Sequence, residues 1–505
     1  MSFTQNCKEV VTKTQKDLPI ESVIQSFNIN SNGVGIKQVL SINALPKVES
    51  VVCYNGFSEI NGTTNAKVLV LNNDNDYVVL EESLPFNTKI QDSEIIDGAN
   101  VLASANLTET KNINANENAI TFSVCVLLNS CLIRAQNFKY VESADSLCQK
   151  NAEFSYDNIA SVISQNVETV NEVNLPNSIS KIILTYGNCN INNCSCASDV
   201  LTLEGKIFAN VLFLTDEDEP KLKSQEYVLD FSQEVLCTGI NQDNFAYCKM
   251  VLNNIDYEIQ GEMNSSKGVL IIKTQSTILG VVKQKVVLNG LIDVFCPTHN
   301  ITCESANMIT QTCNNLYLRE KIDGSLSIND DVQLDKVLCI SNAYVTFNTA
   351  KQENGFEIVG VLHANVIYKI DDEKGTIGAV VAELPFVKQV DDCNYNSLNI
   401  EISVSNIEAR SKRVKDIDLQ SELTILINYA HNESKAIVSN IVIGEVLEQN
   451  YKPIGVYVIS QASELWDVAK LLRTNPNRIT AQNPNLTFPI TEPTKVLVYR
   501  QYGCE

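Results

Sequence analysis

The sequence predicts a mainly β protein: three repeated antiparallel β modules, each a sandwich or an open barrel, followed by a small β-α-α-β domain. Three observations support this fold class. Segments rich in Val, Ile and Thr alternate apolar and polar residues along most of the chain, as half-buried strands do. One set of such segments occurs three times in the same register. Beyond Ile443 the alternation gives way to two short helical patterns.

Three landmarks define the repeat: the start of an apolar segment, then a glycine that precedes an Ala-x-Val strand, then an aromatic residue. The glycine follows the first landmark by 26 residues in every copy. A shared register implies a shared backbone, because a slip of one residue would turn every side chain of a strand to its other face. Two more strand-like segments follow the aromatic residue in each copy. The landmarks are Ile36, Gly62 and Phe86, then Ile179, Gly205 and Phe231, then Leu334, Gly360 and Phe386.

The repeat divides most of the chain into three modules joined by linkers. A length of 505 residues agrees with about three domains. We expect the linkers near residues 135–175 and 285–330, where the alternation weakens. The expected boundaries are 1–135, 136–285 and 286–445 for the modules and 450–505 for the C-terminal domain.

The C-terminal domain shows a helical pattern. In the segment 463–473, four apolar residues lie on one face of a helix, and Ser463 is the expected N-cap. Asn475-Pro476 ends this helix and begins a second one, since proline suits the first helical position. Strand-like segments precede and follow the two helices, which gives the order β-α-α-β. The apolar face consists of Leu465, Val468, Ala469 and Leu472.

This domain resembles a LysM module. The segment from Leu465 to Ala469 is similar to the family's first helix, and the segment from Asn483 to Leu486 is similar to the exit from its second helix. The resemblance implies a binding groove between the turn before the first helix and this exit loop. LysM modules usually bind N-acetylglucosamine glycans there, but Ala462-Ser463-Glu464 stands where the family usually has Gly-Asp-Thr. The departure favours a protein over a glycan as the ligand.

Three β repeats followed by a LysM resemble the SPOCS-domain proteins of endospore-forming Firmicutes, and most closely the LysM-containing spore morphogenetic proteins of clostridia. The resemblance implies a non-enzymatic scaffold on the mother-cell face of the forespore, at the spore coat. It also implies that the LysM binds the ATPase of the coat basement layer. The residues expected to bind the partner or a glycan are Ser463, Glu464, Leu465, Trp466, Asn483, Pro484, Asn485 and Leu486.

Trp466, the single tryptophan of the chain, has two interpretations. On a helical wheel it lies about 120° from the centre of the apolar face, so it stands on the flank of the helix. It either packs against the neighbouring loop or anchors a partner, since tryptophan is enriched at the centres of interfaces.

The composition excludes several other partners. The formal net charge is −22, and a surface this acidic repels nucleic acids and anionic lipids. No apolar run approaches the roughly 18 residues of a membrane span, so we expect no membrane insertion. The N-terminus lacks the apolar segment of a secretory signal, which predicts a cytoplasmic protein.

No catalytic or cofactor-binding pattern is found in the sequence. The three histidines are His299, His363 and His431, and His363 lies within a repeat strand, where a structural role is expected. Phosphate-binding loops, metalloprotease motifs and nucleophile elbows are absent from the sequence. We therefore expect no enzyme and no cofactor.

The sixteen cysteines are expected to be mostly reduced, because a cytoplasmic chain meets a reducing thiol pool. Cys189, Cys194 and Cys196 form the one crowded group, but zinc sites usually use cysteine pairs two to four residues apart that recur at a distance. A thiol-rich strand edge is therefore favoured over a metal site, and late cross-linking is a third interpretation. Cys7 and Cys504, near the chain ends, are suited to intermolecular disulfides.

Three functions remain open from the sequence. The first is a structural adaptor with β modules for assembly and a LysM for docking. The second is a binder of cell-wall glycans, which the replaced turn and the missing secretory signal disfavour. The third is a self-assembling filament or shell built from the β modules, which the sequence does not distinguish from the first.

Overall fold

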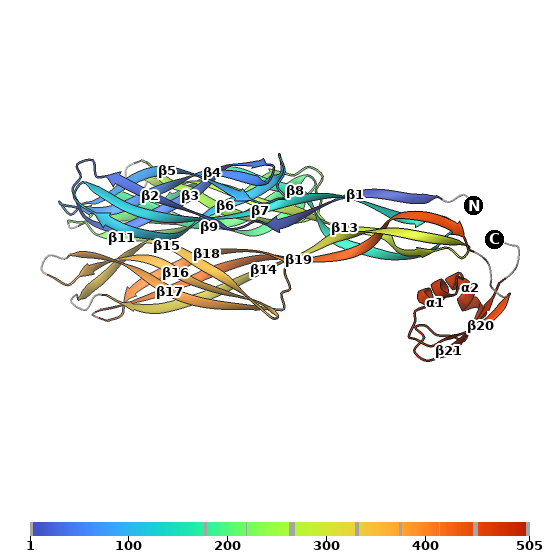
Figure 1. The fold of residues 1–505 in the computed structure, drawn as a ribbon. Coiled ribbons are helices and arrows are strands. Elements are labelled where there is room, and N and C mark those ends of the chain that lie inside the picture. The colour runs from blue at the N-terminus through green and yellow to red at the C-terminus, as the bar shows by residue number, and fades with distance from the viewer. Residues whose placement is uncertain are drawn as a thin grey trace.

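The computed structural model describes residues 4–175, 179–218, 220–261, 268–328, 333–372, 376–413, 415–447 and 453–500. The fold is mainly β: nineteen strands in chain order are followed by a small unit with two strands and two helices (Figure 1). The expected fold class is confirmed, and each repeat consists of two three- or four-stranded antiparallel sheets that face each other across an apolar core.

The first sheet of each repeat contains the three landmarks. It has three strands, and the glycine-bearing strand lies in the middle. The strands are β3 (Ile36–Tyr54), β4 (Phe57–Asn72) and β5 (Tyr77–Gln91); β9 (Ile179–Ala197), β10 (Val200–Thr215) and β11 (Leu222–Leu236); and β15 (Leu334–Gln352), β16 (Gly355–Ile370) and β17 (Ile377–Asp391).

The second sheet is built around the last strand of the repeat, which pairs with the strand that opens the repeat and with the strand before it. The first repeat has one additional N-terminal strand. The strands are β1 (Gln5–Asp17), β2 (Glu21–Asn30), β6 (Asn100–Ala115) and β7 (Ala119–Ala144); β8 (Cys148–Asn174), β12 (Phe245–Gln260) and β13 (Val269–Phe295); and β14 (His299–Ser327), β18 (Ser397–Ser411) and β19 (Asp416–Val446).

The register of the repeat is the one expected from the sequence. The glycine is the sixth residue of a 16-residue strand in all three copies. It pairs directly with the landmark phenylalanine of the neighbouring strand in each copy. The three first sheets therefore share one strand alignment. The pairs are Gly62–Phe86, Gly205–Phe231 and Gly360–Phe386.

The expected linkers are wrong. Residues 135–175 contain the end of β7 and all of β8, and residues 285–330 contain the end of β13 and all of β14. Parts of these strands form a stalk whose two faces meet different neighbours, and other parts lie in the modules, where Ile163 of β8 and Ile322 of β14 join the cores. Ribbons from all three repeats run side by side toward the C-terminal unit (Figure 1).

The stalk has an apolar core to which all three repeats contribute. Tyr140, Gly290 and Ile437 are the twenty-second residues of β7, β13 and β19, so they occupy equivalent positions. A Cβ atom on Gly290 would lie 2.3 Å from Ile437 Cδ1 and 3.2 Å from Tyr140 Cδ2. The side chains of Tyr140 and Ile437 thus occupy the space that a side chain on Gly290 would need, which gives close packing.

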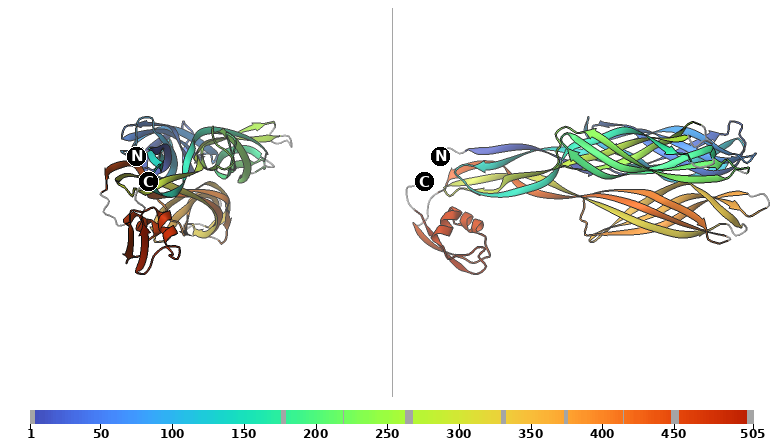
Figure 2. Two further views of the ribbon diagram at one scale, coloured as in Figure 1. Left: turned by 90° about the vertical axis from the view of Figure 1, so that its right-hand side faces the viewer. Right: turned by 180° about the vertical axis from the view of Figure 1, so that it is seen from behind.

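The three repeats are also arranged around a common axis at the broad end of the molecule (Figure 2). Leu69, Leu212 and Ile367 are the thirteenth residues of β4, β10 and β16, and all are 0% exposed within one shared cluster. The second face of each central strand is buried there by the other repeats. This explains why the strands change from alternation to continuous apolar sequence toward their ends.

The C-terminal unit comprises β20 (Ile454–Ile459), α1 (Leu465–Leu471), α2 (Pro476–Gln482) and β21 (Thr494–Tyr499). Val468, Ala469 and Leu472 of the expected apolar face are buried in its core. The expected N-cap is wrong: Glu464 occupies the cap position without a side-chain bond, and Ser463 Oγ donates to the Gln461 carbonyl instead. Within the described chain, no helix has the length and apolarity needed to cross a membrane.

Candidate functional site

In the C-terminal unit, the turn before α1 pairs with Ile490, four residues beyond the expected exit loop Asn483–Leu486. The backbone N–H of Ser463 donates to the Ile490 carbonyl at 3.0 Å, and the N–H of Ile490 donates to the Ser463 carbonyl at 2.9 Å. This pair of bonds fixes the turn before α1 beside the loop that leaves α2. Leu465 and Leu486, one from each segment, pack against the same core.

The eight expected binding residues differ in accessibility. Glu464, Pro484 and Asn485 are exposed. Ser463, Leu465, Asn483 and Leu486 are half-buried, and Trp466 is buried. A ligand in this groove would therefore meet one carboxylate, one proline ring and one carboxamide first.

Asn483 is a structural residue. Its Oδ1 accepts from the N–H of Leu497 at 2.8 Å, and its Nδ2 donates to the Leu497 carbonyl at 2.8 Å and to the Ile479 carbonyl at 2.9 Å. Gln482 binds both backbone groups of Tyr499 in the same way, at 2.8 Å each. These two amide side chains form hydrogen bonds with the backbone groups at the outer edge of β21, as a neighbouring strand would.

Trp466 contacts the stalk. Its side chain is 9% exposed, and its indole N–H donates to Asp293 Oδ2 at 2.8 Å. The indole also meets the ring of Phe295 edge to face, with centroids 5.1 Å apart. Both partners belong to the end of β13. The indole thus packs against β13, a distant segment of the chain, which neither interpretation from the sequence named.

Helix α1 makes further contacts to the stalk. Lys470 Nζ lies 2.7 and 2.8 Å from the two carboxylate oxygens of Asp293. Arg473 donates to the His299 carbonyl at 3.5 Å, and Cys148 belongs to the same apolar cluster as Phe295. Asp293 thus holds the flank of α1 through two residues that are one helical turn apart. Sequence reasoning missed Asp293, because it lies 173 residues from Trp466 in an unremarkable acidic position.

A polar group lies where the three repeats meet, with Ser104 buried and Lys249 and Glu401 half-buried. Ser104, Lys249 and Glu401 are the fifth residues of β6, β12 and β18, so the same site in each repeat holds a hydroxyl, an ammonium and a carboxyl group. Lys249 Nζ donates to Ser104 Oγ at 2.7 Å. Burial raises the pKa of Glu401 to about 7, which the charge of Lys249 opposes. Burial also lowers the pKa of Lys249.

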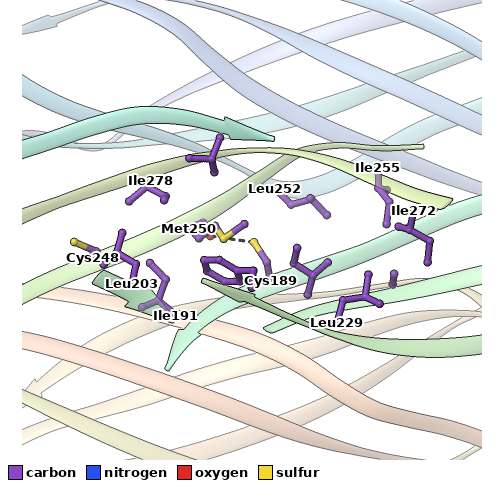
Figure 3. Packing of buried hydrophobic residues seen from close by; sticks show 14 of the residues in the cluster. Cys189, Ile191, Leu203, Leu229, Cys248, Met250, Leu252, Ile255, Ile272 and Ile278 are labelled. Atoms are coloured by element: carbon purple, nitrogen blue, oxygen red, sulfur yellow. Dashed lines mark hydrogen bonds between the residues drawn. The ribbon is translucent and has the colours of Figure 1, made fainter. Parts of the chain in front are cut away.

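The crowded cysteines lie along β9. Cys189 is buried in the core of the second repeat, where its Sγ donates to the Met250 carbonyl at 3.4 Å (Figure 3). A hydrogen bond from the Cys248 thiol lowers the pKa of Cys194, whereas burial raises the pKa of Cys196. In the described part of the chain, no group of three or more His, Cys, Asp or Glu side chains could hold a metal ion.

Cys7 is half-buried at the end of the stalk, and Cys504 lies outside the described residues. The His363 Nε2 lies 2.9 Å from the Thr346 hydroxyl, and its ring stacks on Tyr344. His299 Nδ1 lies 3.9 Å from Cys296 Sγ, but the cysteine side chain is only 2% exposed. A thiol so enclosed offers no approach to a substrate.

One comparison with known proteins gives a match. The family model described as SipL, SPOCS domain matches residues 178–260, which cover β9 to β12 of the second repeat. No curated protein and no solved structure matches the chain. The match indicates a sporulation-related protein and supports the SPOCS part of the resemblance.

Proposed function

We propose that the chain is a non-enzymatic structural adaptor of the bacterial endospore envelope. It acts in the mother cell at the forespore surface, and its C-terminal unit acts as a LysM that docks a protein of the coat basement layer. The SPOCS-domain match of the second repeat carries this proposal. Because the first and third repeats share its strand register, the same assignment extends to them.

The architecture supports a role as a spacer. The repeats share apolar clusters both at the broad end and along the stalk, so they form one continuous packed body rather than domains on flexible linkers. The C-terminal unit is held at the far end of the stalk (Figure 1). A partner bound there is therefore kept at a defined distance from whatever the β modules contact.

The docking surface we propose is the groove with Glu464, Pro484 and Asn485 at its surface. Ser463, Leu465, Asn483 and Leu486 are the half-buried residues of this surface, and Trp466 positions the unit through its contact with Asp293. The ligand is a protein rather than a glycan, because the glycan-type turn is replaced by Ala462-Ser463-Glu464. The partner proposed is the ATPase of the coat basement layer.

The test is co-purification from sporulating cells with the full chain, with residues 1–447, and with the variants Glu464→Lys and Asn485→Ala. The basement-layer ATPase is expected with the full chain alone. If residues 1–447 retain the ATPase, the binding site lies on the β modules instead. Binding of chitin oligomers to the full chain at micromolar affinity would instead favour a glycan ligand.

A further inference from the structure

The outer face of the β20–β21 sheet is apolar and uncovered. Val496 and Val498 point into the core of the C-terminal unit, and the alternate residues of both strands point away from it. Five large apolar side chains lie on this outer face. Their exposed fractions are 59% for Ile454, 61% for Val456, 61% for Val458, 39% for Leu497 and 46% for Tyr499.

These side chains form one patch. Ile454 pairs with Tyr499 and Val456 pairs with Leu497 across the two strands, so the four side chains are neighbours on the same face. Val458 extends the patch and stands opposite Lys495, the charged residue at its border. Five side chains at these exposures present roughly 500 Å² of apolar surface, within the range of about 300–600 Å² for the largest patch on a monomer, which is often functional.

We propose that this patch is covered by the same patch of a second copy of the chain, sheet face to sheet face around a two-fold axis. Two patches would bury roughly 1,000 Å² in total, close to the lower limit for a specific interface. The centre of the patch, at Val456 and Leu497, has no charge, so two copies meet there without like-charge repulsion. A dimer with a dissociation constant on the order of micromolar is expected.

The charge distribution favours a second copy at this end of the molecule. Residues 453–500 contain five Lys or Arg residues and three Asp or Glu residues, which gives a net charge of +2. The rest of the chain therefore has a net charge of −24, whereas the whole chain has −22. Contact through the C-terminal units joins the two least acidic parts and keeps the acidic broad ends far apart, because the unit lies at the tip of the stalk (Figure 1).

The consequence is a bivalent molecule. None of the eight groove residues belongs to the patch, so both grooves stay available in the dimer. Two linked docking sites raise the apparent affinity for a partner that presents many copies of the bound surface, although each site makes the same contacts as before. The dimer does not depend on the proposed function, and its test needs only the purified chain.

The test is sedimentation velocity of the full chain in reducing buffer, from about 1 to 100 µM, so that disulfide-linked dimers do not contribute. The wild type is expected to shift from the mass of one 55.9 kDa chain to twice that mass. Val456→Lys and, separately, Leu497→Lys should each raise the dissociation constant at least tenfold. Val387→Lys is the matched control, because Val387 is an equally exposed valine, at 59%, on β17 of the third repeat.

Thermal melts show whether each variant is folded. If one patch variant does not fold, the other still tests the patch. A wild type that stays monomeric at about 100 µM overturns the proposal. So does a dimer that persists in both folded patch variants, because it must then use another surface.

Discussion

Gly205 and Phe231 are directly paired on β10 and β11, and the phenylalanine ring lies over the glycine. A Cβ atom on Gly205 would stand 2.3 Å from Phe231 Cε1 and 2.1 Å from the backbone oxygen of Asn190. The other two repeats have the same arrangement at Gly62 with Phe86 and Gly360 with Phe386. The two landmarks that recur in the sequence are thus one physical contact, in which an aromatic ring covers a strand glycine.

Gly205→Ala is expected to destabilise the protein by about 1–3 kcal/mol, the range for forced overpacking, because the backbone oxygen of Asn190 cannot move aside as a flexible side chain could. Urea denaturation measures this change. Gly444→Ala is the control: a Cβ atom there would lie 3.4 Å from its nearest neighbours, an ordinary contact. Equal stability of the two variants would contradict the role of the Gly205–Phe231 contact.

The same contact explains what the sequence could predict about the fold. Gly205 and Phe231 are 26 residues apart on neighbouring strands, so their pairing leaves a pattern that repeats with the module. The stalk leaves no such pattern. The layer of Tyr140, Gly290 and Ile437 depends on how three repeats meet, and residues of different kinds occupy equivalent positions there. The linkers were therefore expected where strands exist.

Asp293→Ala is expected to release the C-terminal unit from the stalk. The variant removes the acceptor of the Trp466 indole and the partner of Lys470. Since Trp466 is the only tryptophan, its fluorescence reports directly on this contact. The emission maximum should move to longer wavelength as the indole becomes exposed to water, while the melting temperature of the β body stays the same.

Asp230→Ala is the control for this experiment, because its carboxylate lies on β11 and its side chain is 85% exposed. The control should leave the emission unchanged. If Asp293→Ala also leaves it unchanged, Trp466 remains covered without the hydrogen bond, and the apolar contact with Phe295 is then sufficient for docking.

Lys249 and Glu401 should behave as a coupled pair. Lys249→Met removes the positive charge that favours ionised Glu401, so it should destabilise the protein more at about pH 8 than at about pH 5, where Glu401 is protonated. In the double variant Lys249→Met/Glu401→Leu neither group has to be buried, so this pH-dependent part of the loss should disappear. Guanidinium denaturation of the single and double variants measures both. Additive losses would show that the two groups do not interact.

The same pair predicts a pH dependence. The pKa of Glu401 is raised from 4.5 to about 7 in the folded protein, so the folded state binds more protons than the unfolded state between these values. The stability contributed by protonated Glu401 is present below about pH 4.5 and is lost as the pH rises to about 7, by roughly 3 kcal/mol. The difference in stability between wild type and Glu401→Gln isolates this effect. A difference that is constant across that range would contradict it.

Cys194 and Cys196 should differ in reactivity although they are two residues apart on β9. The hydrogen bond from Cys248 lowers the pKa of Cys194 and favours its thiolate, whereas burial raises the pKa of Cys196. Because the thiolate is the nucleophile, iodoacetamide should modify Cys194 first. Mass spectrometry of briefly alkylated, unreduced protein shows the order. Cys248→Ala should slow the reaction of Cys194, and faster labelling of Cys196 in the wild type would refute the assignment.

The candidate site was only partly predictable for a related reason. The turn and the exit loop are near each other in the sequence, and a resemblance to LysM modules placed them in one groove. The docking of Trp466 on Asp293 is a contact between distant segments, and nothing local marks Asp293. Helical periodicity placed the indole on the flank of α1, but Trp466 is buried in one cluster with Val468 and Ala469. Periodicity could not show that Asp293 and Phe295 cover the indole. The hydrogen bonds of the Asn483 side chain could not be predicted either. In a sequence, an asparagine that binds the backbone cannot be distinguished from one that binds a ligand.

The last prediction separates these two kinds of asparagine in the exit loop. Asn483→Ala removes two hydrogen bonds to Leu497, which hold the edge of β21, and one to the Ile479 carbonyl of α2. Each is worth about 0.5–1.5 kcal/mol, so the variant should lower the melting temperature of the C-terminal unit. Asn485→Ala, two residues later, changes an exposed side chain and should alter stability by less than about 0.5 kcal/mol. If the groove docks the partner, Asn485→Ala should still reduce co-purification of the full chain. Binding of both variants is compared below the melting point of Asn483→Ala. Above that temperature the unfolded unit would lose the partner whether or not Asn483 contacts it. A partner retained by folded Asn485→Ala and by folded Glu464→Lys would place docking outside this groove.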